Sequence, residues 1–269
     1  MSQIDGAGIV ITGAASGIGR QLALRLADRG ARVVLWDLNG QSLGAVADEV
    51  RGRARLDPLT AIVDVGDPEA VRRAAADAGP VDILVNNAGV ISGRVLTELT
   101  DGQIRKTFAV NTLALFWTTR AFLPGMIQRG RGHIVTIASA AGFVGAHRLT
   151  DYTASKHAAV GFDDALRAEL RRVAPGVKTT VVCPFYVDTG MFAGAKTRIP
   201  WLLPILKEAY VVDRVVQAIE RDRRRVLMPR IVHILPLLRV LPVRWFDRII
   251  DLFGVNVSMD GFTGRPPDR

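Results

Sequence analysis

The stretch GIVITGAASGIG, residues 8–19, joins a short β-branched run to a glycine-rich turn. The run predicts a buried strand, and the amphipathic pattern after it predicts a helix over residues 17–29. Gly13, Gly17 and Gly19 permit a tight turn in which backbone N–H groups approach a pyrophosphate at the helix N-terminus. An ordinary strand–helix turn could use the same residues, so the pattern needs support from elsewhere in the chain.

Outward from this turn, β-branched runs alternate with amphipathic stretches, which is typical of a parallel sheet wrapped by helices. The expected strands are residues 8–12, 31–36, 59–63, 81–86, 132–138, 177–183 and 225–228. The expected helices are residues 17–29, 41–51, 68–77, 101–128, 151–173 and 212–221. We therefore expect an α/β fold: a single Rossmann-type, doubly wound domain over residues 1–269, with about seven parallel strands and helices on both faces.

Composition excludes several other classes of protein. The 269 residues are 49% hydrophobic and 23% charged, which excludes disorder. Cys183 is the only cysteine, so a disulfide scaffold is excluded and no metal site is expected. Residues 1–6 lack the features of a signal peptide, so a cytoplasmic location is expected. Most of the net charge of +9 comes from arginines among aliphatic residues from Arg221 to Arg248, a pattern that does not favour nucleic-acid binding.

Asp37 supports the interpretation of the glycine turn as a nucleotide site. It ends the second expected strand, where a carboxylate can accept hydrogen bonds from both ribose hydroxyls and repels a 2′-phosphate. Taken alone, Asp37 would be a turn residue, but together with the turn it favours NAD(H) over NADP(H). Asp64, after the third expected strand, is a candidate contact on the adenine side, with a turn or cap as the alternative.

Three residues near the carboxyl edge of the expected sheet could carry acid–base chemistry. Tyr152 and Lys156 are four positions apart on one helix, so they share a face. An ammonium close to a phenol stabilises the phenolate and lowers its pKa from about 10. Ser139 ends the fifth expected strand and could hydrogen-bond a substrate oxygen. Taken singly, these would be a loop serine, a buried aromatic and a solvated charge.

Together with NNAG (residues 86–89), Asn111 in FAVN and YTASK (residues 152–156), these motifs resemble the short-chain dehydrogenase/reductase family over about residues 8 to 190. The resemblance implies a catalytic tetrad of Asn111, Ser139, Tyr152 and Lys156. Tyr152 would exchange the proton with the alcohol or carbonyl oxygen that Ser139 orients. Lys156 would lower the tyrosine pKa and hold the nicotinamide ribose, and Asn111 would retain a water linking Lys156 to solvent.

The same resemblance implies a set of cofactor contacts, with hydride passing directly to or from the nicotinamide. They are Gly13, Ser16, Gly17, Ile18, Gly19, Asp37, Asp64, Val65, Asn87, Ala88, Gly89, Tyr152, Lys156, Pro184, Val187 and Thr189. One position departs from the family pattern: Phe185 follows Pro184 where the family usually has glycine. We expect this bulky residue to change the local backbone or to leave less room in the pocket.

The stretch CPFYVDTGMF, residues 183–192, and the proline-broken tail of apolar and basic residues after it resemble the retinol and hydroxysteroid dehydrogenase branch of the family. An apolar substrate loop is expected over residues 189–210, although these residues could equally pack on the core or on a partner subunit. An apolar helical C-terminal extension is expected over residues 229–269; its arginines and prolines argue against a membrane span. The extension could lie in a membrane interface with Trp245 and Phe246 inserted, or cover the sheet edge in a dimer.

We therefore expect an NAD(H)-dependent oxidoreductase acting on a hydrophobic alcohol, ketone or aldehyde of retinoid, steroid or fatty-alcohol type. One alternative is a reductase of small or carrier-bound 3-oxo compounds. Another, from a different class, is a non-catalytic nucleotide-sensing or membrane-attached interaction protein. A homodimer or homotetramer through residues 101–128 and 151–173 is expected, with peripheral membrane contact through the extension.

Overall fold

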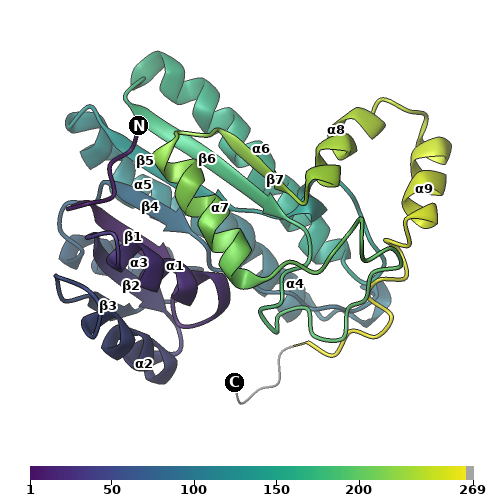
Figure 1. The fold of residues 1–269 in the computed structure, drawn as a ribbon, viewed down its shortest axis with the longest axis horizontal. Helices are drawn as coiled ribbons and strands as arrows, with labels where there is room; N and C mark the ends of the chain where they lie inside the picture. The colour runs from purple at the N-terminus through teal and green to yellow at the C-terminus, as the bar shows by residue number, and fades with distance from the viewer. Residues whose placement is uncertain (265–269) are drawn as a thin grey trace.

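The expected β-branched runs form one parallel sheet in the computed structural model, which describes residues 1–264 (Figure 1). The spatial order of the strands is β3-β2-β1-β4-β5-β6-β7. Their bounds are β1 Gly8–Thr12, β2 Arg32–Asp37, β3 Leu59–Ile62, β4 Ile83–Asn86, β5 Gly132–Ile137, β6 Val177–Pro184 and β7 Arg225–Met228. Every pairing is parallel, so the prediction of seven parallel strands is confirmed.

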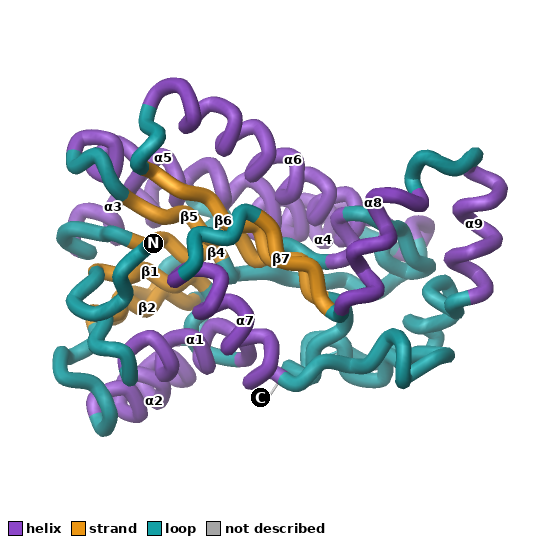
Figure 2. Tube along the Cα trace, turned by 45° about the horizontal axis from the view of Figure 1, so that its top comes forward, coloured by secondary structure: helices purple, strands orange, loops and turns teal. Residues whose placement is uncertain are grey.

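Helices connect the strands and cover both faces of the sheet (Figure 2). Those that flank the sheet are α1 Gly17–Ala27, α2 Gly40–Arg51, α3 Pro68–Asp77, α4 Asp101–Phe108, α5 Ala114–Gln128, α6 Thr150–Val173 and α7 Glu208–Glu220. Helices α1, α2 and α7 pack on one face, and α3, α5 and α6 pack on the other. Strand β1 shows the reason, because its side chains alternate between the two faces. Ile9 and Ile11 pack in the core with α1, α2 and α7, whereas Val10 packs in the core with α3, α5 and α6.

The predicted helix over residues 101–128 is present with those bounds, but it is not α-helical throughout. Helix α4 ends at Phe108, a π-helix, η2 (Ala109–Leu113), follows, and α5 begins at Ala114. The wider turn brings the side-chain amide of Asn111 against the backbone of Val90, to which it donates at 2.9 Å. This tertiary contact leaves no trace in the apolar periodicity, and π-turns of this kind are frequent at functional sites.

The sheet topology creates a crevice at one edge. From β1 the chain crosses to β2 on one side, whereas β4 pairs with β1 on the other side. The chain therefore leaves the carboxyl end of β1 toward one face of the sheet and the carboxyl end of β4 toward the other face. Open α/β sheets bind ligands in the crevice at such a point. The glycine turn after β1 and the NNAG motif after β4 both lie there.

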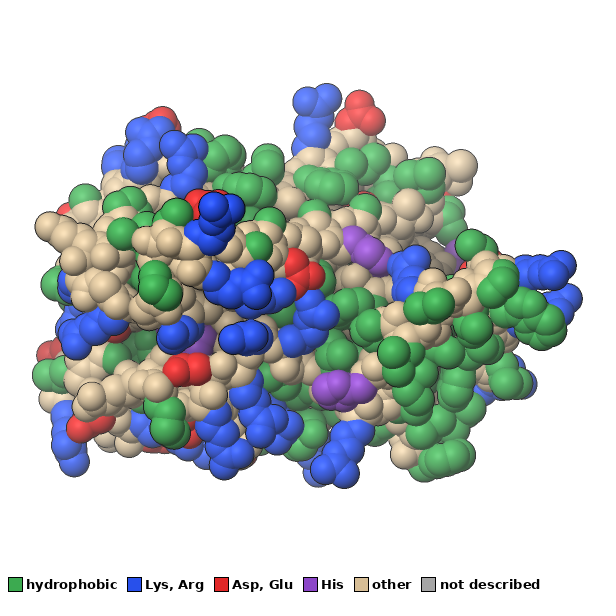
Figure 3. All heavy atoms as spheres, turned by 90° about the horizontal axis from the view of Figure 1, so that it is seen from above, with side chains coloured by type: hydrophobic (Ala, Val, Ile, Leu, Met, Phe, Trp, Pro, Cys, Tyr) green, Lys and Arg blue, Asp and Glu red, His purple; other side chains and the backbone are tan. Residues whose placement is uncertain are grey.

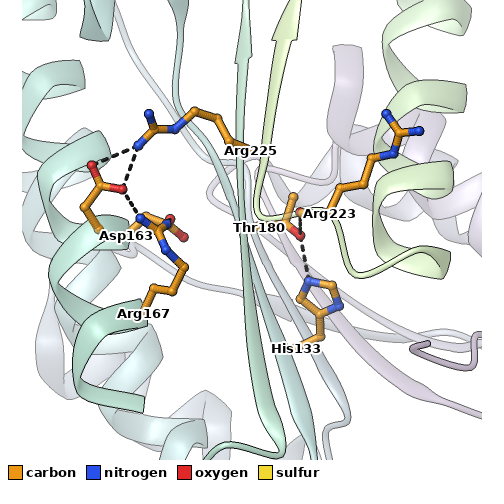
Figure 4. A network of polar contacts seen from close by, with 7 residues as sticks. His133, Asp163, Arg167, Thr180, Arg223 and Arg225 are labelled. Atoms are coloured by element: carbon orange, nitrogen blue, oxygen red, sulfur yellow. Dashed lines mark hydrogen bonds and ion pairs between the residues drawn. The ribbon is translucent and has the colours of Figure 1, made fainter. Parts of the chain in front are cut away.

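A polar network lies near the amino end of β5, away from this crevice (Figure 4). His133 Nε2 lies 2.8 Å from Thr180 Oγ1 on β6, and His133 Nδ1 lies 2.9 Å from Ser2 Oγ. The amino group of Met1 pairs with the Asp222 carboxylate at 2.8 Å. Because His133 is buried, its pKa is lowered to about 4. The network ties the N-terminal residues to the sheet.

Beyond β7 the chain forms short helices that project from the body of the molecule (Figure 1). They are the 3-10 helix η4 (Arg230–Ile234), α8 (Leu235–Leu238) and α9 (Val243–Leu252). The following segment returns to the loop after β6, where Lys196 N donates to Ser258 O and Thr263 N donates to Ala193 O, each at 2.9 Å. Residues 265–269 of the expected extension lie outside the described residues.

Candidate active site

The glycine turn after β1 adopts the tight conformation that its sequence predicts. Gly13 and Gly17 have φ angles of +66° and +54°, a region that other residues rarely adopt. A Cβ on Gly13 would lie 2.8 Å from Ala88 Cα, and one on Gly19 would lie 2.0 Å from Gly13 O. The turn therefore requires glycine for its backbone conformation and for close packing.

The loop after β4 braces this turn. Asn87 Nδ2 donates to the carbonyl oxygens of Thr12 at 3.0 Å and Gly13 at 3.1 Å. The backbone N–H groups of Asn87 and Ala88 both donate to Thr12 Oγ1 at 3.0 Å. These bonds fix the two loops of the crevice to each other.

Asp37 lies at the end of β2 and contacts the same turn. Its Oδ2 accepts from Ala15 N at 2.9 Å, and its Oδ1 accepts from Asn39 N at 3.0 Å. A carboxylate oxygen has two lone pairs, so each oxygen can accept one further hydrogen bond. The side chain is therefore held in position and still able to bind hydroxyl groups.

A cavity of about 740 Å³ follows the carboxyl edge of the sheet from the ends of β2 and β3 to those of β5 and β6. The sequence-predicted residues that line it are Gly13, Ser16, Gly17, Ile18, Asp37, Asp64, Val65, Asn87, Ala88, Gly89, Ser139, Tyr152, Lys156, Pro184, Val187 and Thr189. Gly19 and Asn111 do not line it. Gly19 packs behind the turn, and Asn111 is buried behind Gly89. The structure thus places the glycine turn, Asp37 and Tyr152 around one cavity.

Tyr152 and Ser139 form a hydroxyl pair at one end of this cavity. Ser139, at the end of β5, is held by Ala141 N, which donates to its Oγ at 3.1 Å. Burial raises the pKa of Tyr152 above its ordinary value, and the hydrogen bond with Ser139 only partly opposes this. The phenol therefore stays protonated near neutral pH and can donate its proton to an oxygen in the cavity.

Lys156 lies one helical turn beyond Tyr152, with Nζ 5.7 Å from the centre of the tyrosine ring. It donates to Ile137 O at 3.0 Å and, having three N–H donors, can make further bonds toward the cavity. Burial lowers its pKa to about 8. Lys156 does not offset the burial of the phenol, so the expected lowering of the Tyr152 pKa is not produced by these side chains alone.

Asn111 positions its neighbours from behind the cavity. Its side-chain amide accepts from Val90 N at 2.8 Å and donates to Val90 O at 2.9 Å, which locks η2 to the loop after β4. The amide also lies 3.0 Å from Ser155 Oγ, on the helix that carries Tyr152 and Lys156. This residue thus joins η2, the loop after β4 and α6.

Several residues that line the cavity were not predicted from the sequence. Arg105 and Lys106 of α4 line it together with Ala109 and Val110, which follow one helical turn later. Their spacing of four residues could have predicted that they share one face of the helix, but no sequence motif assigns that face to the cavity. The end near Tyr152 is lined by aromatic and aliphatic side chains instead: Phe185, Met191 and Phe192.

The segment after α9 completes the apolar end of the site. Tyr186 OH lies 2.7 Å from Ser258 Oγ, and the Phe192 ring meets the Tyr152 ring edge-on, with the ring centres 5.7 Å apart. Trp201, in the expected substrate loop, is 83% exposed and lies on the surface instead. Only part of that loop therefore faces the reacting groups.

Residues 1–264 show neither a metal-binding cluster nor a membrane-spanning helix. No group of three or more histidine, cysteine, aspartate or glutamate side chains is placed to hold a metal ion among these residues. None of the helices in this part of the chain combines the length and the apolar character needed to cross a bilayer.

The parallel sheet with helices on both faces agrees with the comparison to solved structures. A model of the short chain dehydrogenase family matches residues 7–199. The chain therefore belongs to the short-chain dehydrogenase/reductase family.

Among curated relatives, epidermal retinol dehydrogenase 2 of Mus musculus is 41% identical over 265 residues, which cover 96% of this chain and 85% of the relative. Retinol dehydrogenase 10 of Homo sapiens is 39% identical over 276 residues, covering 91% and 80%. Among solved structures, a short-chain dehydrogenase/reductase from Burkholderia phymatum in complex with NAD has a TM-score of 0.79 and 29% identity, covering 94% of this chain and 96% of that one.

A metagenomic short-chain oxidoreductase in complex with NADP has a TM-score of 0.69 and 30% identity, covering 84% of this chain and 96% of the other. The similar structures thus include complexes with each of the two dinucleotides.

Proposed function

We propose that the protein is an NAD(H)-dependent oxidoreductase that transfers hydride between the nicotinamide and a hydrophobic alcohol or carbonyl compound. The observation that carries the proposal is that one cavity holds both the glycine turn with Asp37 and the Ser139–Tyr152–Lys156 group. A nucleotide-binding half and an acid–base half in the same space are what such a reaction requires.

The chain's own residues have distinct roles in this proposal. Tyr152 gives its proton to the carbonyl oxygen during reduction and takes it back during oxidation, while Ser139 orients that oxygen. Lys156 keeps donors free toward the nicotinamide ribose, and Asn111 holds η2 and the loop after β4 in place as a positioning residue. The bound dinucleotide supplies the hydride chemistry and, when oxidised, a positive charge that favours ionisation of the phenol.

The preference for NAD(H) rests on Asp37. Its carboxylate is fixed at the cavity wall by two backbone amides and keeps acceptor capacity for the adenine ribose hydroxyls. A 2′-phosphate at that position would meet a negative charge. Arg105 and Lys106, which line the same cavity, add positive charge for the phosphates of either dinucleotide.

The substrate class rests on the apolar end of the cavity and on the relatives. Phe185, Met191 and Phe192 surround the reacting hydroxyls, so a polar substrate would lose water without gaining partners. Two of the similar curated proteins, from Mus musculus and Homo sapiens, are retinol dehydrogenases by name. We therefore assign the start of the 189–210 segment, through Met191 and Phe192, to substrate binding, and a retinoid-like or fatty-alcohol-like compound to the site.

The test is a substrate panel with the purified protein and either dinucleotide. Retinol and long-chain primary alcohols should be oxidised with NAD, with kcat/KM at least about tenfold above that for soluble 3-oxoacyl thioesters in the reverse direction. Turnover of the thioesters alone would replace the proposed substrate class. NADH binding without turnover of any compound would support a nucleotide-sensing protein instead.

The C-terminal extension suits attachment to an anionic membrane surface. In α9 the polar side chains Arg244, Asp247, Arg248 and Asp251 follow helical spacing and form one stripe. The neighbouring apolar residues are exposed: Leu237, Val240, Val243, Trp245 and Leu252. Figure 3 shows hydrophobic side chains gathered at this end of the molecule, with lysine or arginine side chains at its border. Exposed apolar groups beside arginines are what an interfacial helix presents to anionic lipids.

Sedimentation with vesicles tests this attachment. The wild-type protein should bind phosphatidylglycerol vesicles and lose most of this binding in high salt, and the double variant Val240→Asp/Trp245→Ala should not bind. Val173→Asp, at the exposed end of α6, is the matched control and should bind as the wild type does. If the double variant changes the oligomeric state but not vesicle binding, this surface is a subunit interface.

We also propose a homodimer or homotetramer through α5 and α6. Phe116 on α5 is half exposed and packs edge-on against Phe162 of α6, with the ring centres 4.9 Å apart. Leu113 and Ile127 are also exposed apolar residues near or on α5. Light scattering should show an oligomer that Phe116→Glu dissociates; a monomeric wild-type protein would contradict the proposal.

A further inference from the structure

Phe185 occupies a position between three separate hollows. Its backbone N–H donates to Met228 O at 2.8 Å, so the strand-like pairing of β6 and β7 continues to this residue. The side chain lines the large cavity with Tyr152, and it also lines two smaller hollows beyond it. Phe185 is thus the common wall of all three spaces.

The inner of the smaller hollows, of about 30 Å³, also contacts Tyr152 and Ser139 and extends to Val144 and Val255. The outer hollow, of about 60 Å³, shares Phe185, Val144 and Val255 with it. The three hollows therefore lie in a row, separated by shared wall residues, that begins at the reacting hydroxyls and ends among η4, α8 and α9.

The outer hollow has an entirely apolar wall, lined only by valine, leucine, isoleucine and phenylalanine. Such a space offers water no hydrogen-bond partners, so a hydrocarbon chain is its favoured occupant. Leu235, Leu238 and Ile250 supply the part contributed by α8 and α9. Ile234, which also lines the hollow, is 41% exposed, so the hollow reaches the surface beside α8.

We infer that this row is an apolar corridor for the hydrocarbon tail of the substrate, running from the α8–α9 face to Tyr152, and that Phe185 is its gate. The inference deepens the proposed function, on which it rests, by placing the tail of the alcohol. In the present conformation the ring separates the hollows, and a rotation of the side chain joins them. Phe185 then determines how long an alkyl chain the enzyme accepts, while the hydroxyl end lies at Ser139 and Tyr152.

The experiment compares kcat/KM for hexanol and hexadecanol in three variants. Leu235→Trp fills the outer hollow and should lower the hexadecanol-to-hexanol ratio of kcat/KM at least about tenfold. Phe185→Ala removes the gate and should raise that ratio several-fold. Val257→Trp is the matched control, because Val257 is exposed near the same end and lines neither small hollow; its ratio should equal the wild-type ratio. An unchanged ratio in both Leu235→Trp and Phe185→Ala would overturn the corridor.

A binding measurement separates the corridor from the proposed activity. A fluorescent hexadecanol analogue should bind the wild-type protein, and Leu235→Trp should weaken its binding at least about tenfold. If this weakening occurs but no alcohol is oxidised, the proposed function fails and the corridor stands. If alcohols are oxidised but Leu235→Trp binds the probe as the wild type does, the corridor fails alone. Thermal unfolding of each variant shows whether it is folded.

Discussion

Replacing Asp37 with alanine tests the nucleotide half of the site. Each carboxylate oxygen already accepts one backbone N–H, at 2.9 and 3.0 Å, and keeps one lone pair for a ribose hydroxyl. Hydrogen bonds to a charged group contribute roughly 1.5–3 kcal/mol each. The side chain is only partly buried, so we take the lower value for both bonds. Their loss corresponds to about 3 kcal/mol, or about a hundredfold in affinity.

Isothermal titration with NADH and NADPH measures this effect. Asp37→Ala should weaken NADH binding about a hundredfold and NADPH binding less than about tenfold, because the loss of repulsion toward the 2′-phosphate compensates in part. Asp37→Asn, which keeps the shape of the side chain but not its charge, should bind NADH with an affinity between those of wild type and Asp37→Ala. Thermal unfolding controls for the two backbone amides that lose their acceptor. An NADH affinity within threefold of wild type, or a wild-type preference for NADPH, would refute the reasoning.

Two further predictions concern stability. Burial lowers the pKa of His133 to about 4, so the unfolded chain takes up a proton below pH 6.5 that the folded protein excludes. The free energy of unfolding should therefore fall by up to about 3 kcal/mol more between pH 6.5 and 4 in wild type than in His133→Gln. Asp163 has a raised pKa of about 6, which makes stability rise as the pH falls, but it titrates in both proteins and cancels when they are compared. Urea unfolding measures the free energy of each protein over this pH range. The same pH dependence in both would contradict the prediction. Gly19→Ala should lower both the Tm and the NADH affinity, since its Cβ would lie 2.0 Å from Gly13 O. Gly44→Ala in α2, where nothing lies within 4 Å, should stabilise the protein by about 0.5–1 kcal/mol; equal effects of the two substitutions would exclude the packing argument.

Local patterns were enough to predict the sheet and one side of the site. The β-branched runs recur with helical stretches between them, and parallel strands place their carboxyl ends at one edge. Gly13, Asp37 and Ser139, each at or just beyond the carboxyl end of a strand, could therefore be assigned to that edge. Tyr152 and Lys156 followed from helical spacing, and both line the same cavity.

Features that depend on tertiary contacts could not be predicted in this way. The π-turn at Asn111 depends on the backbone of Val90, 21 positions away, and the position of Ser258 depends on Tyr186, 72 positions away. The direction of the Tyr152 pKa depends on how completely the fold buries the phenol, which spacing relative to Lys156 does not reveal. The row of hollows beside Phe185 likewise depends on how α8 and α9 pack.

Hydride transfer in Tyr152→Phe is the most direct test of proton exchange by this phenol. Stopped-flow absorbance with saturating NAD and retinol should show transfer at least about a thousandfold slower than in wild type, with the NADH affinity within about threefold. Tyr210→Phe, on α7, serves as the matched control because Tyr210 is exposed and lines neither the main cavity nor the two small hollows, so it should transfer hydride at nearly the wild-type rate. A wild-type rate in Tyr152→Phe would contradict the account.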